Sequence, residues 1–119
     1  MTGLEYAVLG LRQAIEAPQR HHVWRWLVRH RMAAVKEALR AEHAQGGDGS
    51  LAARESALLR DRDVLLRRLG ELGPQVLEDP DADQVRADLQ RLLTDLERHR
   101  QRLSDLVYDS VSMELGGSE

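Results

Sequence analysis

The sequence predicts an all-α protein, an up-down-up-down four-helix bundle with a short first helix and a long C-terminal helix. Apolar residues recur at steps of three and four along four segments, which is the spacing of one helix face. Glycine and proline separate these segments. A chain of 119 residues has the length of one domain and can bury a core of its own. We therefore expect a single domain over residues 1–119, with antiparallel neighbouring helices because the connections are short.

The first helix is expected over residues 3–17. Thr2 and Glu5 have the spacing of a capping box, in which each side chain accepts a hydrogen bond from the other residue's backbone N–H. Pro18 marks the end of the helix. Its apolar face would be formed by four residues at helical spacing, Leu4, Val8, Leu11 and Ile15.

The second and third helices are expected over residues 19–44 and 51–72. The glycines of residues 45–50 predict a flexible loop between them, because glycine destabilises a helix interior. Gly73 and Pro74 are expected to end the third helix. The core-facing residues of the second helix would be Trp24, Leu27, Val28, Val35 and Leu39. Those of the third would be Leu58, Leu65, Leu66, Leu69 and Leu72.

The fourth helix is expected over residues 80–115, followed by a polar tail over residues 116–119. Asp79 is the predicted N-cap, and Pro80 suits the first helical position. Such a helix would be about 50 Å long at about 1.5 Å per residue. Its stripe follows a heptad pattern through Val85, Leu89, Leu92, Leu96, His99, Leu103, Leu106, Ser110 and Met113.

The segment HHVWRWLVRHR, residues 21–31, holds two tryptophans, three histidines and three arginines. At about 100° per residue, Trp24 lies on the core side of the helix and Trp26 lies about 200° away, on the opposite face. We therefore expect Trp24 in the core. Trp26 is either a single exposed or half-covered side chain, or it forms a subunit contact together with Leu9 and Tyr6. A twofold homodimer would be the commonest form of that contact.

The basic residues of the second helix and a group of acids are expected at the same end of the bundle, where they would complement each other. Such pairs stabilise little when they are exposed. The basic residues are Arg20, Arg25, Arg29 and Arg31, and the acids are Glu78, Asp79, Asp81 and Asp83.

A layer of polar residues is expected inside the bundle. Glu55, Arg62 and His99 project toward the apolar stripes, and we expect a buried ion-pair layer because unpaired charges are costly to bury. Leucine in place of His99 would then be tolerated if Arg62 neutralises the carboxylate of Glu55. The weaker alternative is a metal or small-ligand site formed by Glu42, Glu55 and His99. The Glu-x-x-His pairs of ferritin-like iron bundles do not occur in the sequence.

Charge and composition argue against several classes of function. The net charge of −3 does not favour binding to nucleic acid or to an anionic membrane, and no apolar run is long enough to span a bilayer. The chain has no cysteine and no recognisable catalytic or nucleotide-binding motif, so we expect neither an enzyme nor a cofactor. Because the first residues lack the pattern of a signal peptide, we expect a cytoplasmic protein.

The closing stretch LERHRQRLSDLVYDSVSMELGGSE resembles the end of small uncharacterised all-helical proteins of high-GC actinobacteria. This resemblance implies an all-helical fold and no particular activity. Arginine supplies all but one of the 17 basic residues other than histidine, which is also typical of a high-GC genome.

From the sequence we therefore expect a non-enzymatic helical-bundle protein that binds other proteins or serves as a scaffold, and that associates with itself. The alternative function is a bundle that binds a metal ion or small ligand at its internal layer of glutamate and histidine. The expected partner is protein, most simply a second copy of the chain, and we expect neither nucleic acid nor a membrane as a partner.

Overall fold

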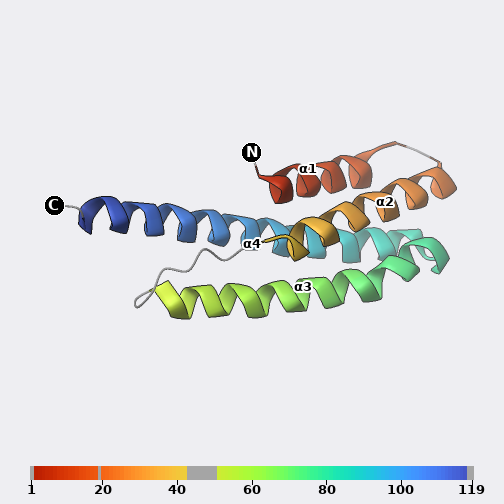
Figure 1. Cartoon of the computed structure of the whole chain (residues 1–119). Helices are drawn as coiled ribbons and strands as arrows, with labels where there is room; N and C mark the ends of the chain where they lie inside the picture. Colours follow the sequence, from red (N-terminus) through yellow and green to blue (C-terminus); the bar gives the residue numbers. More distant parts are fainter. Residues whose placement is uncertain (1, 19, 43–50, 118–119) are drawn as a thin grey trace.

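The computed structural model of the chain describes residues 2–18, 20–42 and 51–117. These residues form four helices and no strand: α1 (Gly3–Glu16), α2 (His21–Arg40), α3 (Ala52–Glu78) and α4 (Ala82–Gly117) (Figure 1). The predicted all-α four-helix bundle is thereby confirmed. The loop predicted at residues 45–50 lies outside the described residues, as do the last two residues of the predicted tail.

The helices surround one main apolar core. Each helix packs on its neighbours in the chain, and α1 also packs on α4. The molecule is elongated, 59 × 23 × 19 Å, because α4 is much longer than α1. Figure 1 shows α4 continuing well past the first turn of α1, with the beginning of α3 beside it. One end of the bundle therefore consists mainly of two helices.

The capping box predicted for α1 is present. The backbone N–H of Glu5 donates to Thr2 Oγ1, and the backbone N–H of Thr2 donates to Glu5 Oε2, both at 3.2 Å. The helix ends at Glu16, one residue before the predicted end, and Ala17 is its C-cap. All four predicted core residues of α1 are buried.

The second helix is shorter than predicted at both ends. It begins at His21 and ends at Arg40, so that Ala41 is its C-cap and Glu42 lies beyond the helix. Its core face contains Trp24, which is 1% exposed, and four further fully buried residues, Val28, Met32, Val35 and Leu39. The predicted placement of Trp24 in the core is confirmed.

The prediction that Gly73 and Pro74 end the third helix is wrong, because α3 continues to Glu78 with Pro74 inside it. Tertiary packing explains the continuation. Val76, beyond the proline, is fully buried, and a Cβ atom at Gly73 would lie 3.2 Å from the guanidinium group of Arg29. The glycine therefore makes room for a side chain of α2, and burial of the last turn offsets the cost of about 3 kcal/mol for a proline inside a helix.

The predicted cap of the fourth helix is also wrong by two residues, because α4 begins at Ala82. Asp81 Oδ1 accepts from the backbone N–H of Gln84 at 3.1 Å, which is the bond of an N-cap. Asp79 instead is the C-cap of α3, and its side chain accepts from the backbone N–H of Asp81. Pro80 therefore lies in the turn. At its other end α4 extends to Gly117, two residues beyond the predicted end.

Three arginines of α2, Arg25, Arg29 and Arg31, bind the backbone of other helices or pack on it. Arg25 Nη1 donates to the carbonyl of Val76 at 2.9 Å, in the last turn of α3, where carbonyls lack partners within the helix. Arg31 packs over Gly10 of α1. Within the described residues, no direct ion pair joins the four basic residues of the prediction to the four acids.

Candidate functional site

His99 is the one fully buried polar or charged side chain among the described residues, with 1% of its surface exposed. It lies on the core-facing stripe of α4, where the positions before and after it in the heptad pattern are leucine, Leu96 and Leu103. A buried imidazole requires hydrogen-bond partners, because an unpaired polar group in the interior costs about 1–3 kcal/mol.

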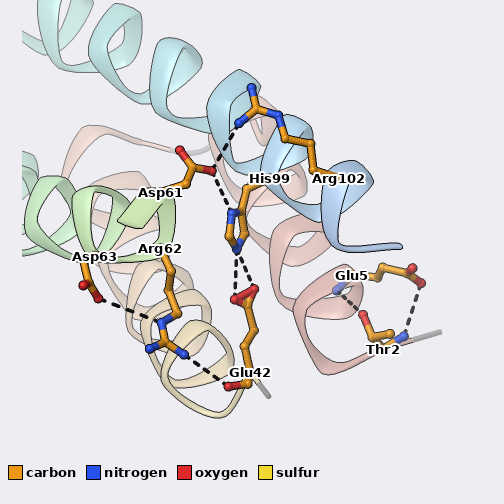
Figure 2. Close-up of polar contacts among 8 residues, drawn as sticks. All are labelled: Thr2, Glu5, Glu42, Asp61, Arg62, Asp63, His99 and Arg102. Carbon is orange, nitrogen blue, oxygen red and sulfur yellow. Dashed lines mark hydrogen bonds and ion pairs between the residues drawn. The ribbon is translucent and has the colours of Figure 1, made fainter. Parts of the chain in front are cut away.

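Both ring nitrogens of His99 contact a carboxylate (Figure 2). Nε2 lies 2.7 Å from Oε1 and 3.0 Å from Oε2 of Glu42, and Nδ1 lies 2.8 Å from Oδ2 of Asp61. Ionised carboxylates only accept hydrogen bonds, so both nitrogens donate only when the ring carries two protons. The geometry therefore fits a positively charged imidazolium between two carboxylates.

Two arginines surround this triad. Arg62 Nη1 donates to the backbone carbonyl of Glu42 at 3.2 Å, and Arg102 Nη1 lies 3.7 Å from Asp61 Oδ2. The Glu42 side chain is 8% exposed, whereas that of Asp61 is 31% exposed. Glu42 is thus the buried partner of His99, and Asp61 connects the imidazole to the surface.

The environment of His99 changes its pKa in two opposing ways. Burial lowers the pKa of His99, because desolvation disfavours the charged ring. The hydrogen bonds and negative charges of Glu42 and Asp61 act in the opposite direction and outweigh burial, so the pKa of His99 is raised above its usual 6.5. The charged form is therefore favoured in the folded state.

The structure brings together only part of the predicted polar layer. Glu42 and His99 meet, but Glu55 is half-buried, and the polar contacts of the described residues include none from Glu55 to His99 or Arg62. Asp61 takes its place. Because α3 continues to Glu78 instead of ending at residue 72, the residue of α3 level with His99 lies six positions later than predicted. A correct end for the third helix would have indicated Asp61.

The described contacts do not bring together the three residues of the alternative metal site: Glu42 contacts His99, and Glu55 contacts neither of them. In the part of the chain that the structure describes, no group of three histidine, aspartate or glutamate side chains is placed to hold a metal ion. A ligating imidazole also needs a free nitrogen lone pair, whereas both nitrogens of His99 contact carboxylates. The hollow beside His99 has a volume of only about 10 Å³, room for about one water molecule.

The three residues predicted to form a subunit contact are all exposed: 63% for Trp26, 63% for Tyr6 and 38% for Leu9. Trp26 stacks on His30 of its own helix, with ring centroids 5.5 Å apart. Leu9 borders a small hollow between α1 and α4.

A larger apolar hollow, which the sequence reasoning missed, lies where α4 passes the beginning of α1. This α4 groove has a volume of about 620 Å³. The signal for it is a second apolar stripe on α4, Val107, Tyr108 and Val111, outside the heptad positions. The residues that line the α4 groove are Thr2, Gly3, Leu4, Ala38, Ala41, Glu42, Arg100, Leu103, Ser104, Val107, Tyr108 and Val111.

Comparison with known proteins gives no match: no family model, curated protein or solved structure is similar to this chain. The described helices contain no stretch that is both long and apolar enough to cross a lipid bilayer.

The protonation of His99 leads to a prediction about stability and pH. Because its pKa is raised in the folded state, the charged ring stabilises the fold fully below the unfolded pKa of about 6.5, and this stabilisation is lost as the pH rises through the folded pKa. The charges that face the ring are Glu42 and Asp61, with Arg62 and Arg102 beside them. The free energy of unfolding in urea is expected to fall as the pH rises above about 6.5 and through the raised pKa of His99. His99→Gln should lose most of this dependence of stability on pH. If the free energy of unfolding falls equally in that variant, the pH dependence comes from other groups.

Proposed function

We propose that this chain is a non-enzymatic helical-bundle protein that acts by binding protein, and that it associates with itself. The observation that carries the proposal is the α4 groove, an open apolar hollow of about 620 Å³ at one end of the bundle. Contiguous exposed apolar surface of this kind marks interaction sites on proteins.

The internal polar layer supports a structural role for His99 over a catalytic one. Its two nitrogens are occupied by Glu42 and Asp61, and the hollow beside it is too small for a substrate. The imidazolium joins α4 to α3 and to the end of α2. We propose that these bonds fix the rotation and register of α4, a role that buried ionic groups have in some helical assemblies.

Self-association is tested by the mass of the protein in solution. The chain has a mass of 13.5 kDa, and static light scattering at about 100 µM is expected to give about twice that value. Dilution toward about 1 µM should return the mass of one chain if the association is reversible. The mass of a single chain across this whole range would contradict the proposal.

A further inference from the structure

We infer that His99, Asp61 and Arg102 form a proton-driven switch: a neutral His99 ring keeps its hydrogen bond to Glu42 and releases Asp61 to Arg102. The inference is independent of the proposed self-association. Three observations carry it: the contacts of both ring nitrogens, the unequal burial of the two carboxylates, and the position of Arg102.

The ring of His99 cannot satisfy both carboxylates after it loses a proton. Nε2 lies 2.7 Å from Oε1 of Glu42, Nδ1 lies 2.8 Å from Oδ2 of Asp61, and each bond needs an N–H. A neutral imidazole has one N–H and one bare nitrogen lone pair, whereas an ionised carboxylate only accepts hydrogen bonds. One of the two carboxylates therefore faces a lone pair, and is repelled, once the ring is neutral.

Glu42 is the carboxylate that the neutral ring retains. Its side chain is 8% exposed, whereas that of Asp61 is 31% exposed and reaches solvent. Among the described residues no arginine pairs with the Glu42 carboxylate, because Arg62 bonds to its backbone carbonyl. Since an unpaired charge is costly to bury, the remaining proton stays on Nε2, and the bare Nδ1 faces Asp61.

Asp61 has a second cation within reach. Its Oδ2 contacts Nδ1 of His99, and the same atom lies 3.7 Å from Nη1 of Arg102 (Figure 2). An approach of about 1 Å would turn this ion pair into a charge-assisted hydrogen bond of about 2.8 Å. The Arg102 side chain is 59% exposed, so solvent surrounds most of it and it has room to move toward Asp61.

The helices stay joined in both states of the switch. Arg102 lies on α4, as His99 does, so Asp61 of α3 remains linked to α4 after its release. The contact that is lost is the bridge from Asp61 through the ring to Glu42, which connects α3 with the residues that follow α2. Deprotonation therefore changes a local connection and leaves the packing of the core in place.

The charges around the ring determine the pH at which the switch operates. Burial lowers the pKa of His99, but Glu42 and Asp61 outweigh burial and raise the pKa above its usual 6.5. Arg62 of α3 and Arg102 of α4 are the neighbouring cations. The release of Asp61 is therefore expected on the alkaline side of pH 6.5.

The charged residues of α1 that lie along this part of α4 have partners of their own. Glu5 pairs with Arg100, and Arg12 pairs with Glu97. They leave the two carboxylates at His99 as the acceptors of its ring protons.

The test is to locate the ring proton of His99 by nuclear magnetic resonance in the full chain labelled with 15N. Both ring nitrogens are expected to carry a proton at about pH 6, and above the pKa Nδ1 should lose its proton while Nε2 keeps it. The signals that disappear in His99→Gln identify this ring among the histidines. A neutral ring with its proton on Nδ1, in whole or in equal part, would overturn the inference. So would a ring that stays charged until the chain unfolds at alkaline pH.

The release of Asp61 to Arg102 has a readout of its own. The 13C signal of the Arg102 guanidinium carbon should shift with the same midpoint as His99. In Asp61→Asn this shift should disappear, because the amide carries no charge and can donate to a bare Nδ1, so it stays with the ring in both states. An Arg102 signal that does not follow His99 in the unchanged protein would overturn the role of Arg102.

Arg102→Gln tests whether a cation must receive the carboxylate. Without Arg102 the neutral state loses its ion pair, so the midpoint of His99 should rise by about 0.5 pH unit, the size expected for one exposed pair. Arg98→Gln is the matched control: Arg98 is 68% exposed, pairs with Asp95 and is expected to leave the midpoint within about 0.1 pH unit at moderate salt. Equal shifts in the two variants would reflect the loss of any positive charge and would overturn the exchange.

Discussion

His99→Leu is expected to lower the free energy of unfolding by about 3–5 kcal/mol, the range for breaking one partner out of a buried ion pair. The change leaves the carboxylate of Glu42, whose side chain is 8% exposed, without a cation in contact. Arg62 does not replace it, since its bond goes to the backbone carbonyl of Glu42 and not to the carboxylate. The sequence had suggested that leucine would be tolerated through Arg62, and this geometry argues against it. Urea unfolding at about pH 6, where His99 is charged, measures the effect.

The double variant His99→Leu with Glu42→Leu is the control for this explanation. It removes both buried charges, and Asp61 retains Arg102 and partial access to solvent. Replacement of a whole buried pair by apolar residues is often neutral or stabilising, so the double variant should recover most of the lost stability. If it is no more stable than His99→Leu, the loss comes from packing of the ring and not from an isolated charge.

Hydrophobic periodicity predicted most of the core of this protein, although Leu27 and Leu66 are only partly buried and Met32, Val76 and Leu93 are buried without having been predicted. Leu4, Val8, Leu11 and Ile15 lie on one face of α1 and are all buried, and Trp24 is buried while Trp26 is exposed. These positions depend on the repeat of the helix alone. The number of helices and their order follow from the same pattern.

The ends of the helices were less predictable, because tertiary contacts determine them. Gly73 and Pro74 have the pattern of a helix end, yet Arg29 packs on the glycine and Arg25 binds the carbonyl of Val76 beyond the proline. The local sequence of a helix end does not indicate which side chains of another helix will pack on it. The same error affected the predicted site. The position of Glu55 along the bundle was counted from residue 72 as the last residue of the third helix, whereas the helix ends at Glu78.

The α4 groove could not be predicted from one helix at a time. Val107, Tyr108 and Val111 resemble scattered apolar surface residues until the beginning of α1 is placed beside Leu103 and Ser104. The difference in helix length, 14 residues for α1 against 36 for α4, was the available signal. The difference in length predicts a groove only once it is known which part of α4 the shorter α1 covers.

Trp24→Ala is expected to lower the free energy of unfolding by about 3–5 kcal/mol, as for other large-to-small changes of buried aromatic residues. Trp24 is 1% exposed, and its Nε1 donates to the carbonyl of Ile15 at 3.0 Å. The guanidinium of Arg86 lies 4.5 Å from the ring centre and also donates to this carbonyl, at 2.6 Å. One side chain thus fills the core and satisfies a carbonyl at the end of α1, which has no partner within the helix.

Trp26→Ala is the matched control, since it makes the same change two residues away on the same helix. Trp26 is 63% exposed, and its described aromatic contact is with His30, so the expected effect is within about 0.5 kcal/mol. Urea unfolding followed by circular dichroism suits both variants, because each retains one tryptophan and the helical signal is independent of it. The free energy of unfolding of Trp24→Phe should lie between those of the two alanine variants. Phenylalanine keeps most of the apolar volume, but the carbonyl of Ile15 then has only Arg86 as its hydrogen-bond donor. Equal losses in the two alanine variants would show that Trp26 is also covered, and the face of α2 that carries it would then be part of an interface.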